Sequence, residues 1–269
     1  MHMDGLKWTK NSLRVLCDIL FPRRCPVCDG LLEPELFEQG IHTECLSKLK
    51  PVHGSVCMQC GRPLENDTTE YCYDCQRLWL NAKSHKMVMQ QKSGMQSGAT
   101  TPIQQGKALF LYEGAIKETM YRFKYSNKRE YADFFAREAV KQYGEWIRSK
   151  HIQVIVPVPM YRAKQRKRGY NQAEVFAKAL GRCLNIPVDT SLVRRVKDTI
   201  PQKELNDLER KNNLKSAFQK IENIVQYSHI LVVDDIYTTG STAMAVAEQL
   251  RKTKASQIYF FSICIGKGM

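Results

Sequence analysis

The stretch that decides the fold is residues 230–242, which read ILVVDDIYTTGST. An apolar run leads into Asp234 and Asp235, a loop rich in hydroxyl groups follows, and a helical pattern begins at Ser241. The apolar run predicts a buried strand of a parallel sheet, and such sheets bind ligands beyond the carboxyl ends of their strands. We therefore expect the two carboxylates and the loop to contact the same ligand.

The loop has the composition of a phosphate-binding site. Backbone N–H groups at the start of a helix lack partners within the helix, and the helix dipole adds partial positive charge there. Gly240 permits close approach of the backbone, and the neighbouring hydroxyls add donors. These hydroxyls belong to Thr238, Thr239, Ser241 and Thr242. Because two carboxylates nearby suit a sugar diol, the stretch predicts a site for ribose 5-phosphate.

Residues 107–269 alternate between strand and helix patterns. Strands are expected at 107–114, 152–159, 229–235 and 257–265, and helices at 115–124, 131–149, 171–184 and 241–253. Apolar strands separated by helices indicate a parallel sheet with helices on both faces. The predicted fold class is therefore α/β.

Seven of the ten cysteines and one histidine form four pairs, each with a two-residue spacer. The pairs are Cys25 with Cys28, His42 with Cys45, Cys57 with Cys60, and Cys72 with Cys75. This spacing lets both side chains of a pair face one cation, and two pairs complete a tetrahedral zinc site. Disulfides, the alternative, are rare in cytosolic proteins. We predict two structural Zn²⁺ sites, with Cys17 as the alternative to His42, and buried thiols at Cys183 and Cys264.

These patterns divide the chain into four parts. They are an amino-terminal helix at 1–24, a double zinc ribbon at 25–80, a linker at 81–106 and the α/β domain at 107–269. The formal net charge of +14 favours an anionic partner, either a nucleic acid or a phosphorylated ligand. With no spanning apolar run and no signal-peptide pattern, we expect a cytoplasmic protein, and peripheral association with a membrane stays open.

Two basic segments are candidates for contact with nucleic acid. Residues 116–131 interleave aromatic side chains with Arg122, Lys124, Lys128 and Arg129. Single-strand binding uses cations along the backbone and aromatic rings that stack on bases. The alternative is an amphipathic helix with Tyr121 and Phe123 in the core. Residues 162–168 form a second basic segment, expected as a loop, with Arg162, Arg166 and Lys167.

Residues 230–242 resemble the PRPP-binding signature of type I phosphoribosyltransferases, in which two acids precede a T-T-G-type loop. The resemblance implies that Asp234 and Asp235 bind the ribose hydroxyls and that residues 238–242 bind the 5-phosphate. It also implies a magnesium ion that bridges ribose and pyrophosphate. A receiver domain, the other class with a VVDD strand, is excluded because no later strand ends in an acid.

The whole chain resembles the ComF family of competence proteins, which join a zinc ribbon to a phosphoribosyltransferase-like domain. The resemblance rests on the four cysteine pairs, the RGYNQ element at 168–172, the segment at 199–218 and the PRPP loop. It implies a role late in DNA uptake during natural transformation, with single-stranded DNA, a helicase-like ATPase and a recombinase-loading protein as partners. Arg168 and Asn171 are further candidates for contact with PRPP.

Two hypotheses about activity stay open at this point. In the first, the protein binds single-stranded DNA and carries a PRPP pocket that does not catalyse transfer. In the second, it is an active phosphoribosyltransferase with an unknown acceptor. The sequence contains no base-recognition motif that would decide between them.

Overall fold

The computed structural model describes residues 22–78, 80, 101–197, 217–220, 226–253 and 255–267. Cys17, most of the expected amino-terminal helix and linker, and nearly all of the segment at 199–218 lie outside the described residues. Within the described part, no helix has the length and apolar character needed to cross a membrane.

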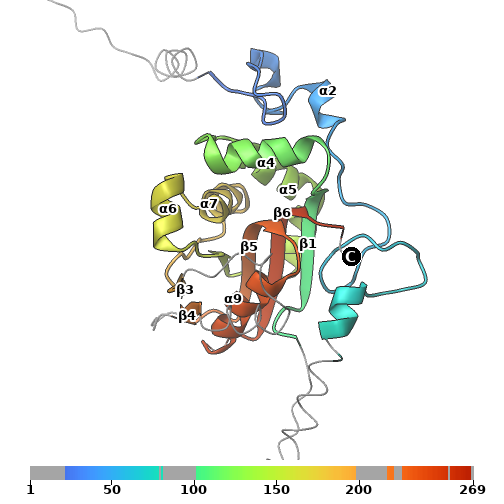
Figure 1. Ribbon diagram of the computed structural model, residues 1–269, viewed down its shortest axis with the longest axis vertical. Helices are drawn as coiled ribbons and strands as arrows, with labels where there is room; N and C mark the ends of the chain where they lie inside the picture. The colour runs from blue at the N-terminus through green and yellow to red at the C-terminus, as the bar shows by residue number, and fades with distance from the viewer. Residues whose placement is uncertain are drawn as a thin grey trace, which may run out of the picture.

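The central sheet has four parallel strands in the order β1-β6-β5-β2, so the predicted parallel α/β class is confirmed. Figure 1 labels β1, β6 and β5 of this sheet. The strands are β1 (Gln105–Leu111), β2 (Val154–Pro157), β5 (His229–Tyr237) and β6 (Gln257–Ile265). Strand β5 runs two residues beyond its expected end because pairing with β6 continues to Tyr237. Asp234 and Asp235 therefore lie within the strand, not at its end.

Helices cover both faces of this sheet. One face carries α4 (Ala115–Tyr125), α5 (Tyr131–Ser149) and α7 (Gln172–Leu184). The opposite face carries α9 (Ser241–Arg251) and an antiparallel pair, β3 (Val193–Arg195) with β4 (Phe218–Lys220). The four predicted helices thus form close to their expected bounds.

The basic segment 162–168 differs from expectation, because it is a helix, α6 (Arg162–Arg168), and not a loop. Its residues are good helix formers, and Gly169 ends it with a φ of +83° that favours glycine. The segment carries no apolar stripe that would predict a helix, and none of its residues is buried in the structure.

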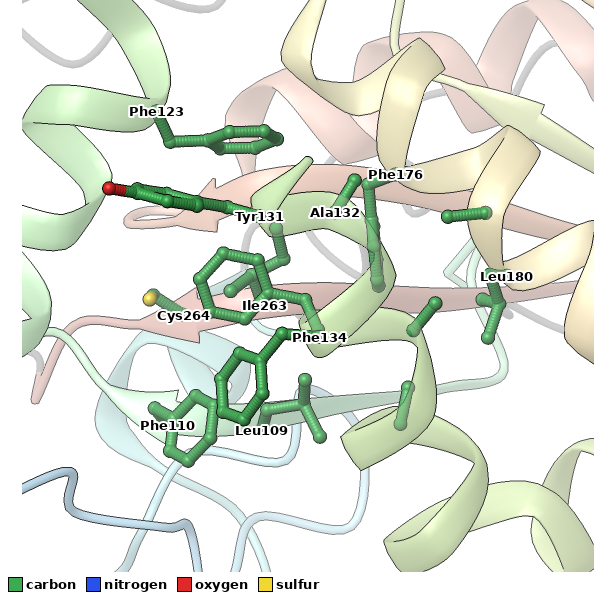
Figure 2. Close-up of a cluster of buried hydrophobic side chains, with 14 of the residues drawn as sticks. Leu109, Phe110, Phe123, Tyr131, Ala132, Phe134, Phe176, Leu180, Ile263 and Cys264 are labelled. Atoms are coloured by element: carbon green, nitrogen blue, oxygen red, sulfur yellow. The ribbon is translucent and has the colours of Figure 1, made fainter. Parts of the chain in front are cut away.

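Two layers of apolar side chains fill the space on either side of the sheet. Figure 2 shows one layer, in which Phe123, Phe134 and Phe176 from the helices meet Ile263 and Cys264 from β6. The thiol of Cys264 is fully buried, as predicted.

Cys183 does not follow the prediction of a buried thiol, because its side chain is exposed. The buried face of α7 is formed by Phe176, Ala177 and Leu180, and Cys183 lies in the last turn beyond that face.

The zinc-ribbon segment is packed onto the sheet. It contains the short helices η1 (Pro34–Leu36) and α2 (Thr43–Leu46). Its first half lies beyond α4 and its second half beside β1 (Figure 1). The N–H of Val52 donates to the carbonyl of Leu109 at 2.8 Å, and the N–H of Leu111 donates to Lys50 at 2.8 Å. The ribbon therefore covers the free edge of β1.

Candidate functional site

The first predicted ligand set comes together in the structure. The ligand atoms of Cys25, Cys28, His42 and Cys45 all lie within 4.8 Å of one another. His42 places Nδ1 3.3 Å from the Cys28 sulfur, while Nε2 lies 2.9 Å from the carbonyl of Leu31. Donation by Nε2–H to that carbonyl leaves Nδ1 as the ligand atom, which is the arrangement expected of a zinc-bound histidine.

The second predicted ligand set is more deeply buried. Cys57, Cys60, Cys72 and Cys75 are all buried, and their sulfurs lie within 4.8 Å of one another. The sulfurs of Cys60 and Cys72 are 3.6 Å apart, close to the ~3.8 Å of thiolates around tetrahedral zinc. A disulfide would require about 2 Å. Both sets therefore fit Zn²⁺ with four protein ligands and no open position, which is typical of structural sites.

The predicted phosphate loop lies between the end of β5 and the start of α9. Gly240 precedes α9 with a φ of +75°, a conformation that side chains other than glycine rarely adopt. A Cβ at Gly240 would overlap the hydroxyl of Tyr237. Thr238 and Thr239 are exposed, and the hydroxyls of Thr239 and Ser241 are 2.8 Å apart. The loop thus presents hydroxyls and helix-start N–H groups to an incoming anion.

The two acids share a partly buried position beside this loop. The N–H of Asp235 donates to the Asp234 carboxylate at 2.8 Å, and Lys124 on α4 contacts Asp235 at 2.9 Å. Burial and the adjacent Asp235 carboxylate raise the pKa of Asp234 to about 8. Burial opposes the charged form of Lys124, but Asp235 outweighs it, so the pKa of Lys124 is raised. Two acids with one ammonium can accept a further cation together with a diol.

The cations of residues 116–131 are largely engaged within the protein, unlike the outward-facing cations expected from the sequence. Lys124 pairs with Asp235 at 2.9 Å, and Lys128 pairs with Asp29 at 2.7 Å. Arg122 donates to the carbonyl of Val27, and Arg129 stacks on the Tyr170 ring at 4.8 Å. The reason is that α4 lies between the sheet and the first metal cluster, which the residue spacing does not reveal.

The aromatic residues of α4 divide between core and surface. Phe123 is fully buried, whereas Tyr121 and Tyr125 are 62% and 57% exposed. Their ring centroids are 4.9 Å apart, and the Arg168 guanidinium lies 5.0 Å from the Tyr125 centroid. The alternative prediction, that both Tyr121 and Phe123 lie in the core, is therefore confirmed for Phe123 and wrong for Tyr121.

The remaining predicted residues lie in α6 and at the start of α7. Arg162, Arg166 and Lys167 occupy α6, which has no buried residue. Asn171 caps α7 by accepting from the Ala173 N–H at 3.2 Å, and its amide donates to Val158 at 2.9 Å. The Asn171 side chain is thus already committed to holding the turn between β2 and α7.

One residue of this region was missed by the sequence analysis. Arg62, between the two halves of the second cysteine set, is 3% exposed and donates to the carbonyl of Thr238 in the phosphate loop. No sequence signal could have found it, because 176 residues separate the two partners. The second metal cluster thus lies directly behind the loop.

Comparisons with known proteins agree with these features. Residues 16–76 match the double zinc ribbon domain family. The chain is 29% identical to competence protein F of Haemophilus influenzae, over 90% of this chain and 97% of that protein. It is 27% identical to competence protein ComFC of Bacillus subtilis, over 87% and 86% respectively.

A third relative is the DNA utilization protein YhgH of Salmonella typhimurium, 31% identical over 57% of this chain and 68% of that protein. Among solved structures, an adenine phosphoribosyltransferase aligns with 48% of the chain and 70% of its own length, at 18% identity and a TM-score of 0.31. The Salmonella typhimurium relative exceeds 30% identity over more than two thirds of its own length, and the longer matches are to competence proteins, so the chain belongs to the ComF family of competence proteins.

Proposed function

We propose that the residues beside the end of β5 form a pocket that binds PRPP together with Mg²⁺, in a cytoplasmic protein that acts late in DNA uptake. The observation that carries this proposal is the loop 238–242 at the start of α9, with Asp234 and Asp235 beside it. Helix-start N–H groups suit a phosphate, and carboxylates suit the hydroxyls of a ribose. The names of the relatives, which refer to competence and DNA utilization, favour the biological role.

Each part of the pocket has a distinct task in this proposal. The loop around Gly240 holds the 5-phosphate, and the carboxylates of Asp234 and Asp235 accept hydrogen bonds from the ribose hydroxyls. Lys124 balances the charge of Asp235, which it contacts at 2.9 Å. Magnesium would neutralise the charge of pyrophosphate oxygens, since it binds through one or two carboxylates and substrate phosphates.

Calorimetry of PRPP with Mg²⁺ tests the pocket. The double variant Asp234→Ala, Asp235→Ala should lose binding while retaining two zinc ions. Gly240→Val should do the same, because the side chain would strain the turn and overlap Tyr237. The matched control is Gly114→Val, which also replaces a positive-φ glycine at a helix start but has open space around its Cβ. Unchanged affinity in a folded Gly240→Val protein would remove the phosphate-loop assignment.

Proton release gives a second test of the same pocket. Because the pKa of Asp234 is about 8, this carboxyl is mostly protonated at pH 7 and must ionise to accept hydrogen bonds from the ribose hydroxyls as a carboxylate. Affinity for magnesium PRPP should therefore rise between pH 7 and pH 9, with proton release in buffers of differing ionisation enthalpy. Asp234→Asn should remove that part of the release. An equal release from this variant would contradict the assignment.

Single-stranded DNA is the second proposed ligand. The exposed pair Tyr121 and Tyr125, next to Arg168 and the basic helix α6, combines rings that can stack on bases with cations for phosphates. Affinity should fall with salt, with a logarithmic slope of roughly 0.7 per neutralised phosphate. The triple alanine variant of Arg166, Lys167 and Arg168 should bind DNA more weakly with a shallower slope. If it loses PRPP and keeps DNA, α6 belongs to the PRPP pocket.

Activity and protein partners complete the proposal. Pyrophosphate release from labelled PRPP, measured with and without DNA, separates a binding protein from an active transferase with an unknown acceptor. A helicase-like ATPase and a recombinase-loading protein are the proposed partners, and pull-down with each purified protein in the presence of single-stranded DNA tests them. Failure to co-purify with either would leave DNA as the only proposed macromolecular partner.

A further inference from the structure

We propose that Arg62 is a positioning residue for the phosphate loop, and that zinc in the cluster of Cys57, Cys60, Cys72 and Cys75 thereby sets the affinity of the pocket. The inference rests on the proposed function of the pocket as a phosphoribosyl site. It adds a regulatory input, because the occupancy of a metal site outside the pocket would control ligand binding.

Arg62 is held by the metal cluster on one side and reaches the loop on the other. Its backbone carbonyl accepts from the Cys57 N–H at 2.7 Å. Its guanidinium pairs with Asp74, which lies between Cys72 and Cys75, and donates through its other terminal nitrogen to the Thr238 carbonyl. The side chain is 4% exposed, so the guanidinium has exchanged water for these partners. Both cysteine pairs of the second zinc site therefore hold the Arg62 side chain in place.

A hydrogen bond to the Thr238 carbonyl orients the peptide group that follows it. In a trans peptide the C=O and the next N–H point in opposite directions within one plane. By holding the carbonyl toward the ribbon, Arg62 directs the N–H of Thr239 away from the ribbon. Thr239 is exposed, so the side of the loop toward which this N–H is directed is open to a ligand. The buried guanidinium also adds positive charge behind the site of an anion.

A second contact joins the cluster to the loop. Tyr237 is 8% exposed and belongs to the same buried group of side chains as the four cysteines. Its ring packs on Phe260 with a centroid separation of 5.0 Å, and its hydroxyl lies against Gly240. Displacement of the second cysteine cluster would therefore alter the surroundings of both Thr238 and Gly240.

Zinc is what fixes this arrangement. A ribbon of this size lacks an apolar core of its own and depends on metal for its folded structure. Without zinc, Asp74 and Arg62 lose their fixed positions and the loop loses its support. Because coupling between two sites is reciprocal, PRPP should protect the second zinc from a chelator by the same factor by which zinc improves PRPP affinity.

The test compares two arginines, one in each ribbon half. Arg62→Met removes the bond to Thr238 and nearly preserves volume. Arg24→Met is the matched control, because Arg24 donates to the carbonyl of Asp29 at 2.8 Å, within the segment that carries Cys25 and Cys28. The measurements on the full chain are zinc content, amide hydrogen exchange of residues 238–242, and affinity for magnesium PRPP. We expect Arg62→Met alone to show faster exchange and an affinity about 5- to 150-fold weaker.

Three outcomes decide the matter. An Arg62→Met protein with two zinc ions, unchanged exchange and unchanged affinity overturns the proposal. If wild-type protein fails to bind PRPP, the function of the pocket is wrong, and the exchange of residues 238–242 still tests the positioning. If Arg62→Met loses zinc, Arg62→Lys is measured instead; it keeps a charge for Asp74 but lacks the planar fork that reaches two acceptors. Equal exchange in Arg62→Lys and wild type would then overturn the proposal.

Discussion

The two metal clusters have the same spacing of ligands but opposite places in the molecule. The first packs against α4 and α5 on one face of the sheet, and one of its ligands, Cys28, is exposed. The second has four buried cysteines and packs with α9 on the other face. The same local motif therefore has different surroundings at its two positions, since among the described residues only the second cluster is joined to the phosphate loop, through Arg62.

The contacts that attach the two clusters also differ in kind. The first is attached through side chains, with Asp29 accepting from the Tyr131 hydroxyl at 2.7 Å and pairing with Lys128. The second is attached through the backbone as well as through the Arg62 side chain, since the Gly106 N–H donates to the Gln59 carbonyl at 2.6 Å. Backbone contacts of this closeness leave no room for a side chain, so the second cluster should be less tolerant of change.

The largest expected effect comes from removing one ligand in each cluster. Cys60→Ser should lose one zinc, lower the free energy of unfolding by several kcal/mol and weaken PRPP binding, because the site supplies folding energy and supports the loop. Cys28→Ser should lose the other zinc and retain PRPP binding. Zinc content, denaturant unfolding and calorimetry measure this difference. Equal loss of PRPP affinity in both variants would contradict the statement that only the second cluster supports the phosphate loop.

The next effect concerns the close approach of the second cluster to β1. Gly61 has a φ of +75°, and a Cβ there would lie 2.6 Å from the carbonyl of Gly106. Gly61→Ala should cost ~2–3 kcal/mol, the sum of backbone strain and this overlap. Gly54→Ala is the control, because its φ is +73° and its Cβ would meet nothing within 4 Å. In denaturant unfolding, Gly54→Ala should lower the free energy of unfolding by ~1–2 kcal/mol, from backbone strain alone.

The sequence was sufficient for features that depend on local pattern. Residues 230–242 identified the strand, loop and helix, and the cysteine spacing identified both ligand sets, because each rests on neighbours along the chain. It was insufficient where the answer depends on packing between distant segments. Two contacts are of this kind, that of Lys124 with Asp235 and that of Arg62 with Thr238. No sequence pattern predicts either contact.

A smaller effect is expected in the order of zinc release. The first cluster should yield its metal to a chelator faster than the second, because Cys28 is exposed whereas the second set is buried throughout. A colorimetric zinc indicator should therefore report two phases, each of one zinc per chain. Addition of PRPP should slow only the later phase. Slowing of the earlier phase instead would assign the coupling to the first cluster.

The smallest effect concerns Asp29, which attaches the first cluster to α5. Although its partial burial favours the neutral acid, the hydrogen bonds from Lys128 and Tyr131 outweigh burial and hold the pKa of Asp29 below its usual value. A lowered pKa contributes stability that is present above the unfolded pKa of about 3.9 and is lost as pH falls through the lowered value. Asp29→Asn should therefore cost ~1 kcal/mol, equally at pH 8 and pH 5.5.

Asparagine tolerates the φ of +59° at position 29, so the Asp29→Asn variant removes charge without adding backbone strain. Asp133→Asn is the matched control, because Asp133 pairs with Arg182 at 2.7 Å but both side chains are more than half exposed. Its cost should be a few tenths of a kcal/mol. If the cost of Asp29→Asn varied between pH 5.5 and pH 8, the contribution would come from another group that titrates there and not from the Asp29 contacts.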